Sequence, residues 1–290
     1  MIGLLSRFTL AVMWLLHWLP LPLIRVAGLG IGFMLYLAIP QRRQIVMTNL
    51  RLCFPQRDES WRRNVMRRHF FAFACSAVDR SLFWWASEAR LRRLIRFYGE
   101  EHLKAGDGRP TILLVPHFVG LDAAGMAMGM CMPVVSIYAR QKNPVFDARL
   151  LAGRLRFNQP LLLSRQDGMR RVLKALKDGY PFFYLPDMDF GAKDAVFVPF
   201  FGVPTATITG VSRLARLSGA RVVPCIARMT TAGYDVTLMP PWTDYPGESL
   251  EADTERMNAF IEAEVLKMPE QYFWSHKRFK SRPPGEKGVY

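Results

Sequence analysis

Apolar residues gather in two runs near the beginning of the chain. The first run covers residues 8–24, the second covers residues 26–39, and Arg25 separates them. A helix needs roughly 20 apolar residues to cross a bilayer, and a single span over both runs would place Arg25 inside the membrane at a cost of about 2.5–3.5 kcal/mol. The pattern leaves two interpretations: a membrane anchor, spanning or half-inserted, or a pair of buried core helices.

Aromatic and basic residues beside the two runs favour the anchor. The aromatic types that gather at membrane–water interfaces are present as Trp14, Trp18 and Tyr36. Arg42 and Arg43 follow the second run directly. We therefore predict an N-terminal membrane anchor over residues 1–40. If this anchor spans the membrane, the tendency of basic flanks to remain inside leaves residues 41–290 in the cytoplasm.

The segment after the anchor is rich in arginine, and residues 61–73 show the period of an amphipathic helix. Its polar side holds Arg63, Asn64, Arg67 and Arg68, and its apolar side holds Trp61, Val65, Met66, Phe70 and Phe73. Arg62 falls on the apolar side, against the pattern. A basic helix beside an apolar N-terminus is typical of proteins that bind anionic membrane lipids, although an ordinary solvated helix explains the same pattern.

From residue 111 onward, short apolar runs alternate with amphipathic stretches. The apolar runs predict strands, and they cover residues 111–116, 134–139, 160–164, 181–186, 195–200 and 221–228. The amphipathic stretches predict helices over residues 168–178, 207–218 and 249–267. This alternation predicts an α/β fold with a mainly parallel central sheet flanked by helices. Since the sequence shows no repeat or linker, we expect residues 41–290 to form a single domain.

Composition narrows the possible partners. The 290 residues include 39 Lys and Arg against 24 Asp and Glu, a net charge of +15, which favours an anionic partner. A chain that is 50% hydrophobic is not disordered, and apolar stretches confined to its first 40 residues exclude a polytopic transporter. Nucleic acid is not expected, because no RNA-binding, zinc-finger or basic-zipper motif is present. The four cysteines lie far apart, so neither disulfides nor a metal site is predicted.

A histidine follows the first predicted strand of the α/β region. His117 comes directly after Pro116, and Asp122 follows five positions later. Functional groups of parallel sheets gather beyond the carboxyl ends of strands. If a helix begins at Gly120, the Asp122 carboxylate can reach one imidazole nitrogen and leave the other free to accept a proton. Because a protein nucleophile is missing from this pattern, the pair suits activation of a substrate hydroxyl. A buried structural pair is the alternative.

Ordered blocks along the chain resemble the bacterial lipid A biosynthesis acyltransferases, a branch of the lysophospholipid acyltransferase superfamily. The blocks are VPHFVGLDAAG (115–125), YARQKNPVFD (138–147), GRLR (153–156), YLPDMDFG (184–191), VFVPFFGVPTAT (196–207) and WSHKRFKSRP (274–283). The wider superfamily tends to have Asn before the histidine and PEGT as its third block. Pro116 and PDMD stand in those places here, which favours the lipid A branch.

The resemblance implies an enzyme that moves a fatty acyl chain from acyl carrier protein to a hydroxyl of a lipid A precursor. His117 and Asp122 would be the catalytic dyad of a single displacement that needs no metal or cofactor. Arg154, Arg165 and Arg140 would bind the phosphates and acidic sugars of the acceptor, and Asp187 and Asp189 would shape its site. Surface arginines and a turn capped by aspartates are the structural alternatives.

The resemblance also implies a place at the bacterial inner membrane, with the catalytic domain on the cytoplasmic side. Acyl carrier protein, the lipid A precursor and anionic membrane lipids would be the partners. Two alternatives stay open. One is an acyltransferase acting on another lipid or glycolipid. The other is a non-catalytic basic membrane-binding protein, which leaves the ordered blocks after residue 111 unexplained.

Overall fold

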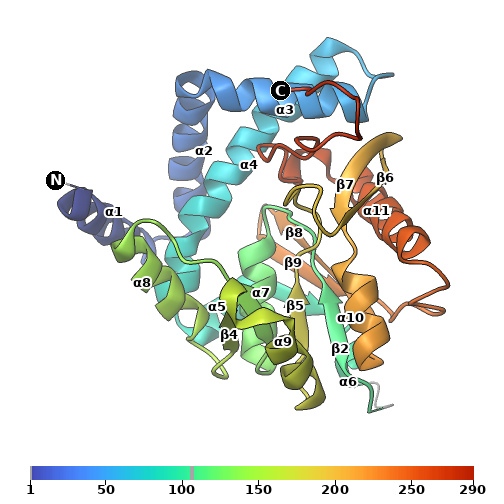
Figure 1. The fold of residues 1–290 in the computed structure, drawn as a ribbon. Coiled ribbons are helices and arrows are strands. Elements are labelled where there is room, and N and C mark those ends of the chain that lie inside the picture. Colours follow the sequence, from blue (N-terminus) through green and yellow to red (C-terminus); the bar gives the residue numbers. More distant parts are fainter. Residues whose placement is uncertain (1, 105–107) are drawn as a thin grey trace.

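A seven-stranded sheet forms the centre of the computed structural model, which describes residues 2–104 and 108–290 (Figure 1). In spatial order its strands are β1 (Ile95–Tyr98), β9 (Gly233–Leu238), β8 (Arg221–Thr230), β2 (Thr111–Leu114), β5 (Phe182–Tyr184), β3 (Val135–Tyr138) and β4 (Leu161–Ser164). Neighbouring strands run parallel, except for the antiparallel hairpin of β8 and β9. The predicted α/β fold with a mainly parallel sheet is confirmed.

Two further strands form a separate antiparallel hairpin. They are β6 (Ala195–Phe200) and β7 (Val203–Ile208), and Val196 pairs with Thr207. The sequence pattern predicted a helix from residue 207, but the helix α10 (Gly210–Ser218) begins three residues later. That boundary was wrong because the β-branched residues before Gly210 extend the hairpin.

Helices cover both faces of the central sheet. They are α5 (Glu88–Leu94), α6 (Glu101–Lys104), α7 (Leu121–Cys131), α8 (Pro144–Arg154), α9 (Gly168–Lys177), α10 and α11 (Leu250–Lys267), with single turns η1 (Arg165–Asp167) and η2 (Pro269–Gln271). Alternate residues of β2 point to opposite faces, as in any strand. Ile112 and Leu114 join the core beneath α9, α10 and α11, while Leu113 joins the core beneath α7.

The described chain begins with α1 (Ile2–Leu16), α2 (Leu21–Ala38), α3 (Pro40–Cys53) and α4 (Glu59–Trp85), all of which come before α5 and the sheet. Helix α2 lies along α4 (Figure 1). Gly28 and Gly32 allow this approach, because a Cβ on either glycine would come within 2.8 Å of α4 atoms at Cys75 and Phe71. One face of α2 is therefore packed against the protein.

Arg25 is paired inside the protein. Its guanidinium contacts the carboxylate of Asp79 on α4 at 2.8 Å, and Asp79 is fully buried. The hydroxyl of Tyr234 on β9 donates to the same carboxylate at 2.5 Å. The residue that interrupts the two apolar runs therefore joins α2 to the rest of the protein and does not face outward.

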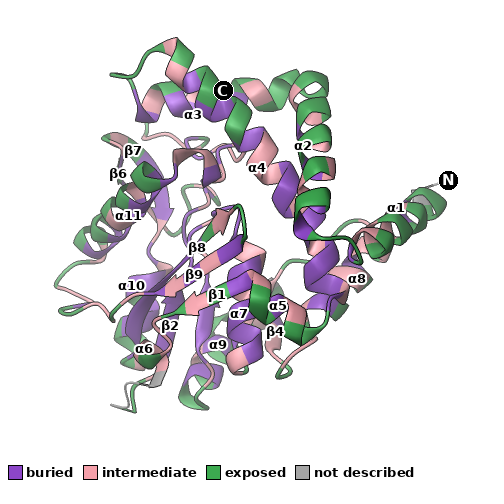
Figure 2. Cartoon of the chain, turned by 180° about the vertical axis from the view of Figure 1, so that it is seen from behind, coloured by how far each residue is buried: buried purple, intermediate pink, exposed green. Residues whose placement is uncertain are grey.

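The outward face of α1 and α2 is apolar and exposed (Figure 2). On α2 this face consists of Leu23, Val26, Leu29, Phe33, Met34 and Leu37. Within the described residues, α2 alone is long and apolar enough to cross a membrane, with a mean hydropathy of 1.8 over 18 residues. That residues 1–40 act as a membrane anchor stays a prediction.

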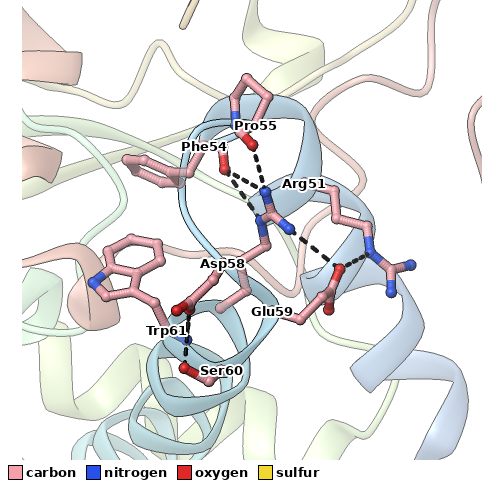
Figure 3. A network of polar contacts seen from close by, with 8 residues as sticks. Arg51, Phe54, Pro55, Asp58, Glu59, Ser60 and Trp61 are labelled. Atoms are coloured by element: carbon pink, nitrogen blue, oxygen red, sulfur yellow. Dashed lines mark hydrogen bonds and ion pairs between the residues drawn. The ribbon is translucent and has the colours of Figure 1, made fainter.

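The position of Arg62 on the apolar side of α4 is explained by its hydrogen bonds. It lies on the buried side, where its guanidinium donates to the carbonyl oxygens of Phe54 and Pro55 at 2.8 Å (Figure 3). These carbonyls follow the end of α3 and lack partners within the helix. Arg62 also pairs with Glu59, which binds Arg51 at 2.8 Å. The Arg62 guanidinium thus holds the turn between α3 and α4 in place.

Candidate active site

His117 lies just beyond the carboxyl end of β2, and its side chain contacts Asp187, which follows the neighbouring strand β5. Its Nδ1 lies 2.7 Å from Oδ1 of Asp187. The backbone N–H of His117 donates to Oδ2 of the same carboxylate at 2.9 Å. Because β2 and β5 pair in parallel, their carboxyl ends lie at the same edge of the sheet, and this brings the two residues together across 70 positions of sequence.

The Asp187 carboxylate is enclosed by donors. Its side chain is 1% exposed, and the Tyr272 hydroxyl also hydrogen-bonds to it. Burial by itself would raise the pKa of Asp187, but the His117 ring and the two hydrogen bonds from His117 outweigh it and lower that pKa. An ionised carboxylate only accepts hydrogen bonds, so Nδ1 of His117 carries the proton. Nε2 is then the ring nitrogen able to accept a proton from a substrate.

Asp122 has a different partner. Helix α7 begins at Leu121 with Gly120 as its N-cap, so the helix start that the sequence analysis required is present. The carboxylate, however, pairs with Arg80 of α4, with 2.6 Å between Nε and Oδ2. The sequence predicted that Asp122 orients the imidazole, whereas the structure gives that contact to Asp187. Burial opposes ionisation of Asp122, but Arg80 and then Arg154 lower its pKa overall.

An apolar cavity of about 110 Å³ lies beside Asp122. It runs between α7, α8 and the strands β3, β4 and β5. Its charged lining residues are Arg80, Asp122 and Arg154. Most of the remaining wall is apolar, and α7 contributes Gly125 and Gly129, which lie one turn apart on the same side of the helix. The Arg154 guanidinium also lies over the ring of Tyr138, 5.4 Å from its centroid.

Comparison with known proteins identifies the family. Residues 4–281 match the model of the bacterial lipid A biosynthesis acyltransferases. The protein belongs to this family. It is 35% identical to the lipid A biosynthesis lauroyltransferase of Escherichia coli over 99% of this chain and 94% of that protein. It is 33% identical, with the same coverage, to the palmitoleoyltransferase of that organism. The predicted resemblance is confirmed, and the protein is an acyltransferase.

A more distant relative agrees with this assignment. The lipid A biosynthesis myristoyltransferase of Escherichia coli is 31% identical over 84% of this chain and 77% of that protein. A solved 1-acyl-sn-glycerophosphate acyltransferase from Thermotoga maritima covers 84% of this chain and 96% of its own, with 13% identity and a TM-score of 0.40. That likeness is too weak to bear on the mechanism of a lipid A acyltransferase.

The other predicted residues of this lipid A acyltransferase lie outside the His117–Asp187 pair. Asp189 is buried, and its carboxylate accepts hydrogen bonds from the backbone and hydroxyl of Ser281 at 2.6 and 2.9 Å. Its backbone N–H donates to Nε2 of His276 at 2.9 Å. Burial, followed by the nearby Arg278 guanidinium, lowers the pKa of His276 to about 4. Asp189 and His276 therefore fasten the PDMD loop to the C-terminal segment.

The predicted arginines do not gather in one place. Arg154 lines the apolar cavity, whereas the Arg140 side chain is 90% exposed and lies 3.7 Å from Asp147. Arg165 begins η1 directly after β4, and its side chain lies outside the part that the structure describes. Within the described residues, no three His, Cys, Asp or Glu side chains gather to hold a metal ion. That the enzyme needs no metal or cofactor stays a prediction.

Sequence reasoning missed Arg80, Tyr272 and Phe273. Phe273 packs against the catalytic candidate itself: its ring lies 6.2 Å from the His117 ring, at 25° to it, and its backbone N–H donates to the His117 carbonyl oxygen at 3.0 Å. All three residues reach the site from segments that are distant in sequence. The one sequence signal was the position of Tyr272 and Phe273 next to the WSHKRFKSRP block.

Proposed function

We propose that the protein transfers a fatty acyl chain from acyl carrier protein to a hydroxyl of a lipid A precursor similar to Kdo-lipid IVA. The observation that carries this proposal is the His117–Asp187 pair, which holds Nδ1 protonated and leaves Nε2 as a base. Membership of the lipid A acyltransferase family supports the acceptor, because its relatives are named for the lauroyl, palmitoleoyl and myristoyl groups that they transfer in lipid A biosynthesis.

His117 acts as the general base of a single displacement. Nε2 takes the proton from the acceptor hydroxyl while the oxygen attacks the thioester carbonyl carbon. The tetrahedral intermediate then expels the carrier thiolate, which receives the proton from the imidazolium, and an ester remains on the acceptor. Asp187 keeps the imidazole in the required tautomer and stabilises the imidazolium that forms. No acyl-enzyme arises in this scheme.

Asp122 keeps a place in the proposed site with a different task. Together with Arg80 and Arg154 it gives the otherwise apolar cavity a charged wall. We assign this cavity to the donor's acyl chain, because each buried methylene group contributes about 0.8 kcal/mol to binding. The charged wall then lies near the polar thioester end of the donor. Arg140 and Arg165 are proposed contacts to phosphates of the acceptor, since guanidinium groups bind phosphate through paired hydrogen bonds.

The exposed apolar face of α1 and α2 is proposed to lie in the bacterial inner membrane, with the catalytic region on the cytoplasmic side. Anionic lipids would meet the exposed arginines on the polar face of α4, and the net charge of +15 would speed encounter with an acidic carrier protein. These assignments agree with an acceptor that is itself a membrane lipid.

Mass spectrometry of the acceptor tests the proposal. Purified enzyme, acyl carrier protein charged with a defined chain and a lipid A precursor should yield a product heavier by one acyl group. The His117→Ala variant should yield no such product, while its thermal unfolding and its membrane association match the wild type. Wild-type yield from His117→Ala would overturn the base. Acylation of a different glycolipid in place of the precursor would overturn the acceptor.

A further inference from the structure

A second apolar cavity, of about 270 Å³, lies on the N-terminal side of the site. It is a groove between the end of α2, the middle of α4 and the segment after η2. The apolar residues that line this groove are Leu35, Ile39, Phe70, Phe73 and Phe273, and its polar lining residues are Arg42, His69 and Ser275. Within the described residues, it shares no lining residue with the cavity assigned to the donor chain.

The groove reaches the catalytic base through one side chain. Phe273 forms part of the groove wall, and its ring stacks on both Phe73 and His117, with centroids 5.8 and 6.2 Å apart. An acyl chain in the groove is therefore separated from the His117 ring only by the ring of Phe273.

The groove also joins the exposed apolar surface of α2. Leu35 and Ile39 form its edge, and the neighbouring positions Phe33, Met34 and Leu37 are 55%, 61% and 57% exposed. A hydrocarbon chain can thus move from the outward face of α2 into the groove without leaving apolar surroundings.

A cation stands at the polar end of the groove. Arg42 is exposed, and one of its N–H groups donates to the carbonyl oxygen of Ser275 at 3.0 Å. The remaining N–H groups of this guanidinium fit an anionic headgroup. His69 is buried in the groove wall and its pKa is lowered to about 4 by that burial, so it adds no charge near neutral pH.

We propose that this groove binds a hydrocarbon chain of the acceptor lipid while the donor's chain occupies the cavity beside α7. The inference rests on the proposed function. A lipid acceptor must keep its chains out of water while its hydroxyl reaches Nε2 of His117. One apolar cavity is bounded by Phe273 beside His117, and the other by Leu185, two positions before Asp187. Two separate cavities of this kind, the first continuous with the outward face of α2, meet that requirement for two lipid substrates.

Filling the groove tests the inference. The variants are Leu35→Trp and Ile39→Trp. The matched control is Leu23→Trp, which places the same side chain on the outward face of α2 at the end of the helix far from the groove. Both groove variants should raise the KM for the lipid A precursor roughly tenfold or more, as expected when a chain loses an apolar pocket. The KM for the acyl carrier protein donor should stay unchanged, and the control should match the wild type in both.

Direct binding separates this inference from the proposed function. Binding of the precursor is measured in detergent micelles, and thermal unfolding verifies that each variant is folded. If the wild type binds the precursor more tightly than the groove variants but transfers nothing, the groove stands and the proposed reaction fails. If the wild type transfers acyl groups and the groove variants match Leu23→Trp, the groove inference alone fails. A raised donor KM would likewise overturn it, and a wild type that neither binds nor acylates the precursor would overturn both.

Discussion

Two segments near His117 each carry a carboxylate, and the two carboxylates differ in exposure and in hydrogen-bonding partner. Asp187, in the loop after β5, is 1% exposed and accepts hydrogen bonds from His117 and Tyr272. Asp122, in the first turn of α7, is 27% exposed and pairs with Arg80 in the wall of a cavity. The nearer residue in sequence is not the one that holds the imidazole. Adjacent parallel strands determine which carboxylate reaches the ring.

The largest expected effect follows from the buried carboxylate. Asp187→Asn removes the negative charge that stabilises the imidazolium and places an N–H₂ group against a donor. We expect kcat to fall by roughly 10²–10⁴-fold, with little change in the KM of either substrate. Steady-state kinetics with acyl carrier protein and the lipid A precursor measures both values.

The control for that substitution is Tyr272→Phe. It removes one hydrogen bond from the same carboxylate but keeps the carboxylate and the ring, so kcat should fall far less than with Asp187→Asn. Circular dichroism and thermal unfolding verify the fold of both variants. Unchanged kcat in a folded Asp187→Asn variant would show that His117 needs no partner on Nδ1.

A smaller effect is expected at Asp122, the carboxylate in the cavity wall. Asp122→Asn and Arg80→Gln should each reduce kcat/KM for the donor by about 10–100-fold, because each leaves one charge of the cavity wall without its partner. The double variant should be little worse than either single variant, since both act on one pair. A double-mutant cycle on donor kinetics measures this coupling.

The Asp122 and Arg80 variants can also show that Asp122, and not Asp187, acts on the His117 imidazole. If Asp122→Asn abolishes turnover as fully as Asp187→Asn while Arg80→Gln does not, then Asp122 acts on the imidazole during the reaction. The local pairing expected from the five-position spacing would then describe the working enzyme, and the pairing with Arg80 a resting arrangement.

Filling the cavity beside Asp122 should change the length of the transferred acyl chain and lower the rate only modestly. A Cβ added at Gly129 meets its nearest neighbour, Cβ of Phe157, at 4.0 Å, so a side chain there has room to enter the cavity. Gly129→Leu should shorten the acyl chain that is transferred, since one methylene group changes selectivity by roughly 10–200-fold. Competition between carrier proteins charged with different chains, followed by mass spectrometry, gives the ratio. Gly30→Leu, at another open helical glycine, is the control.

The last prediction concerns the pH dependence of the free energy of unfolding and does not involve activity. Burial lowers the pKa of His69 to about 4 from 6.5, so between these values the unfolded chain binds a proton that the folded protein excludes. Stability should therefore fall with decreasing pH across this window, by about 1.4 kcal/mol per pH unit for this one group. His276 acts in the same direction.

The buried carboxylates affect folding stability at lower pH than the histidines do. The lowered pKa of Asp187 stabilises the folded state above the unfolded value of 3.8, and that contribution is lost below it. Urea unfolding from pH 7 to pH 3 separates the two windows, and His69→Gln should flatten only the upper one. An unchanged upper slope in that variant would assign the window to other groups.

Prediction from the sequence succeeded where the signal was local. The strands β2, β3, β4, β5, β6 and β8 and the helices α9 and α11 lie where apolar runs and amphipathic periods placed them, whereas no strand was predicted at β7. β9 was missed although Tyr234, Val236 and Leu238 alternate with polar residues, a signal that could have revealed it. β1 spans four residues at the end of a helix, too few to show a period.

The site needed information that the sequence does not carry. The contact between His117 and Asp187 depends on the order of β2 and β5 in the sheet, and that order follows from packing across the whole fold. The same reason hid the partner of Arg25, because Asp79 lies 54 residues further along. Charges whose counterions come from distant elements look isolated in a linear pattern, as Arg25 did.

One helix joins the two ends of the enzyme. On α4, Asp79 binds Arg25 of α2, and the next residue, Arg80, binds Asp122 at the catalytic edge of the sheet. Successive residues of a helix point about 100° apart, so the adjacent residues Asp79 and Arg80 can contact different parts of the protein. The one helix α4 therefore connects α2 to the first turn of α7. If α2 lies in the bilayer, as proposed, helix α4 would set the height of His117 above the lipid. The enzyme would then choose among the hydroxyls of its acceptor by their depth as well as by their chemistry.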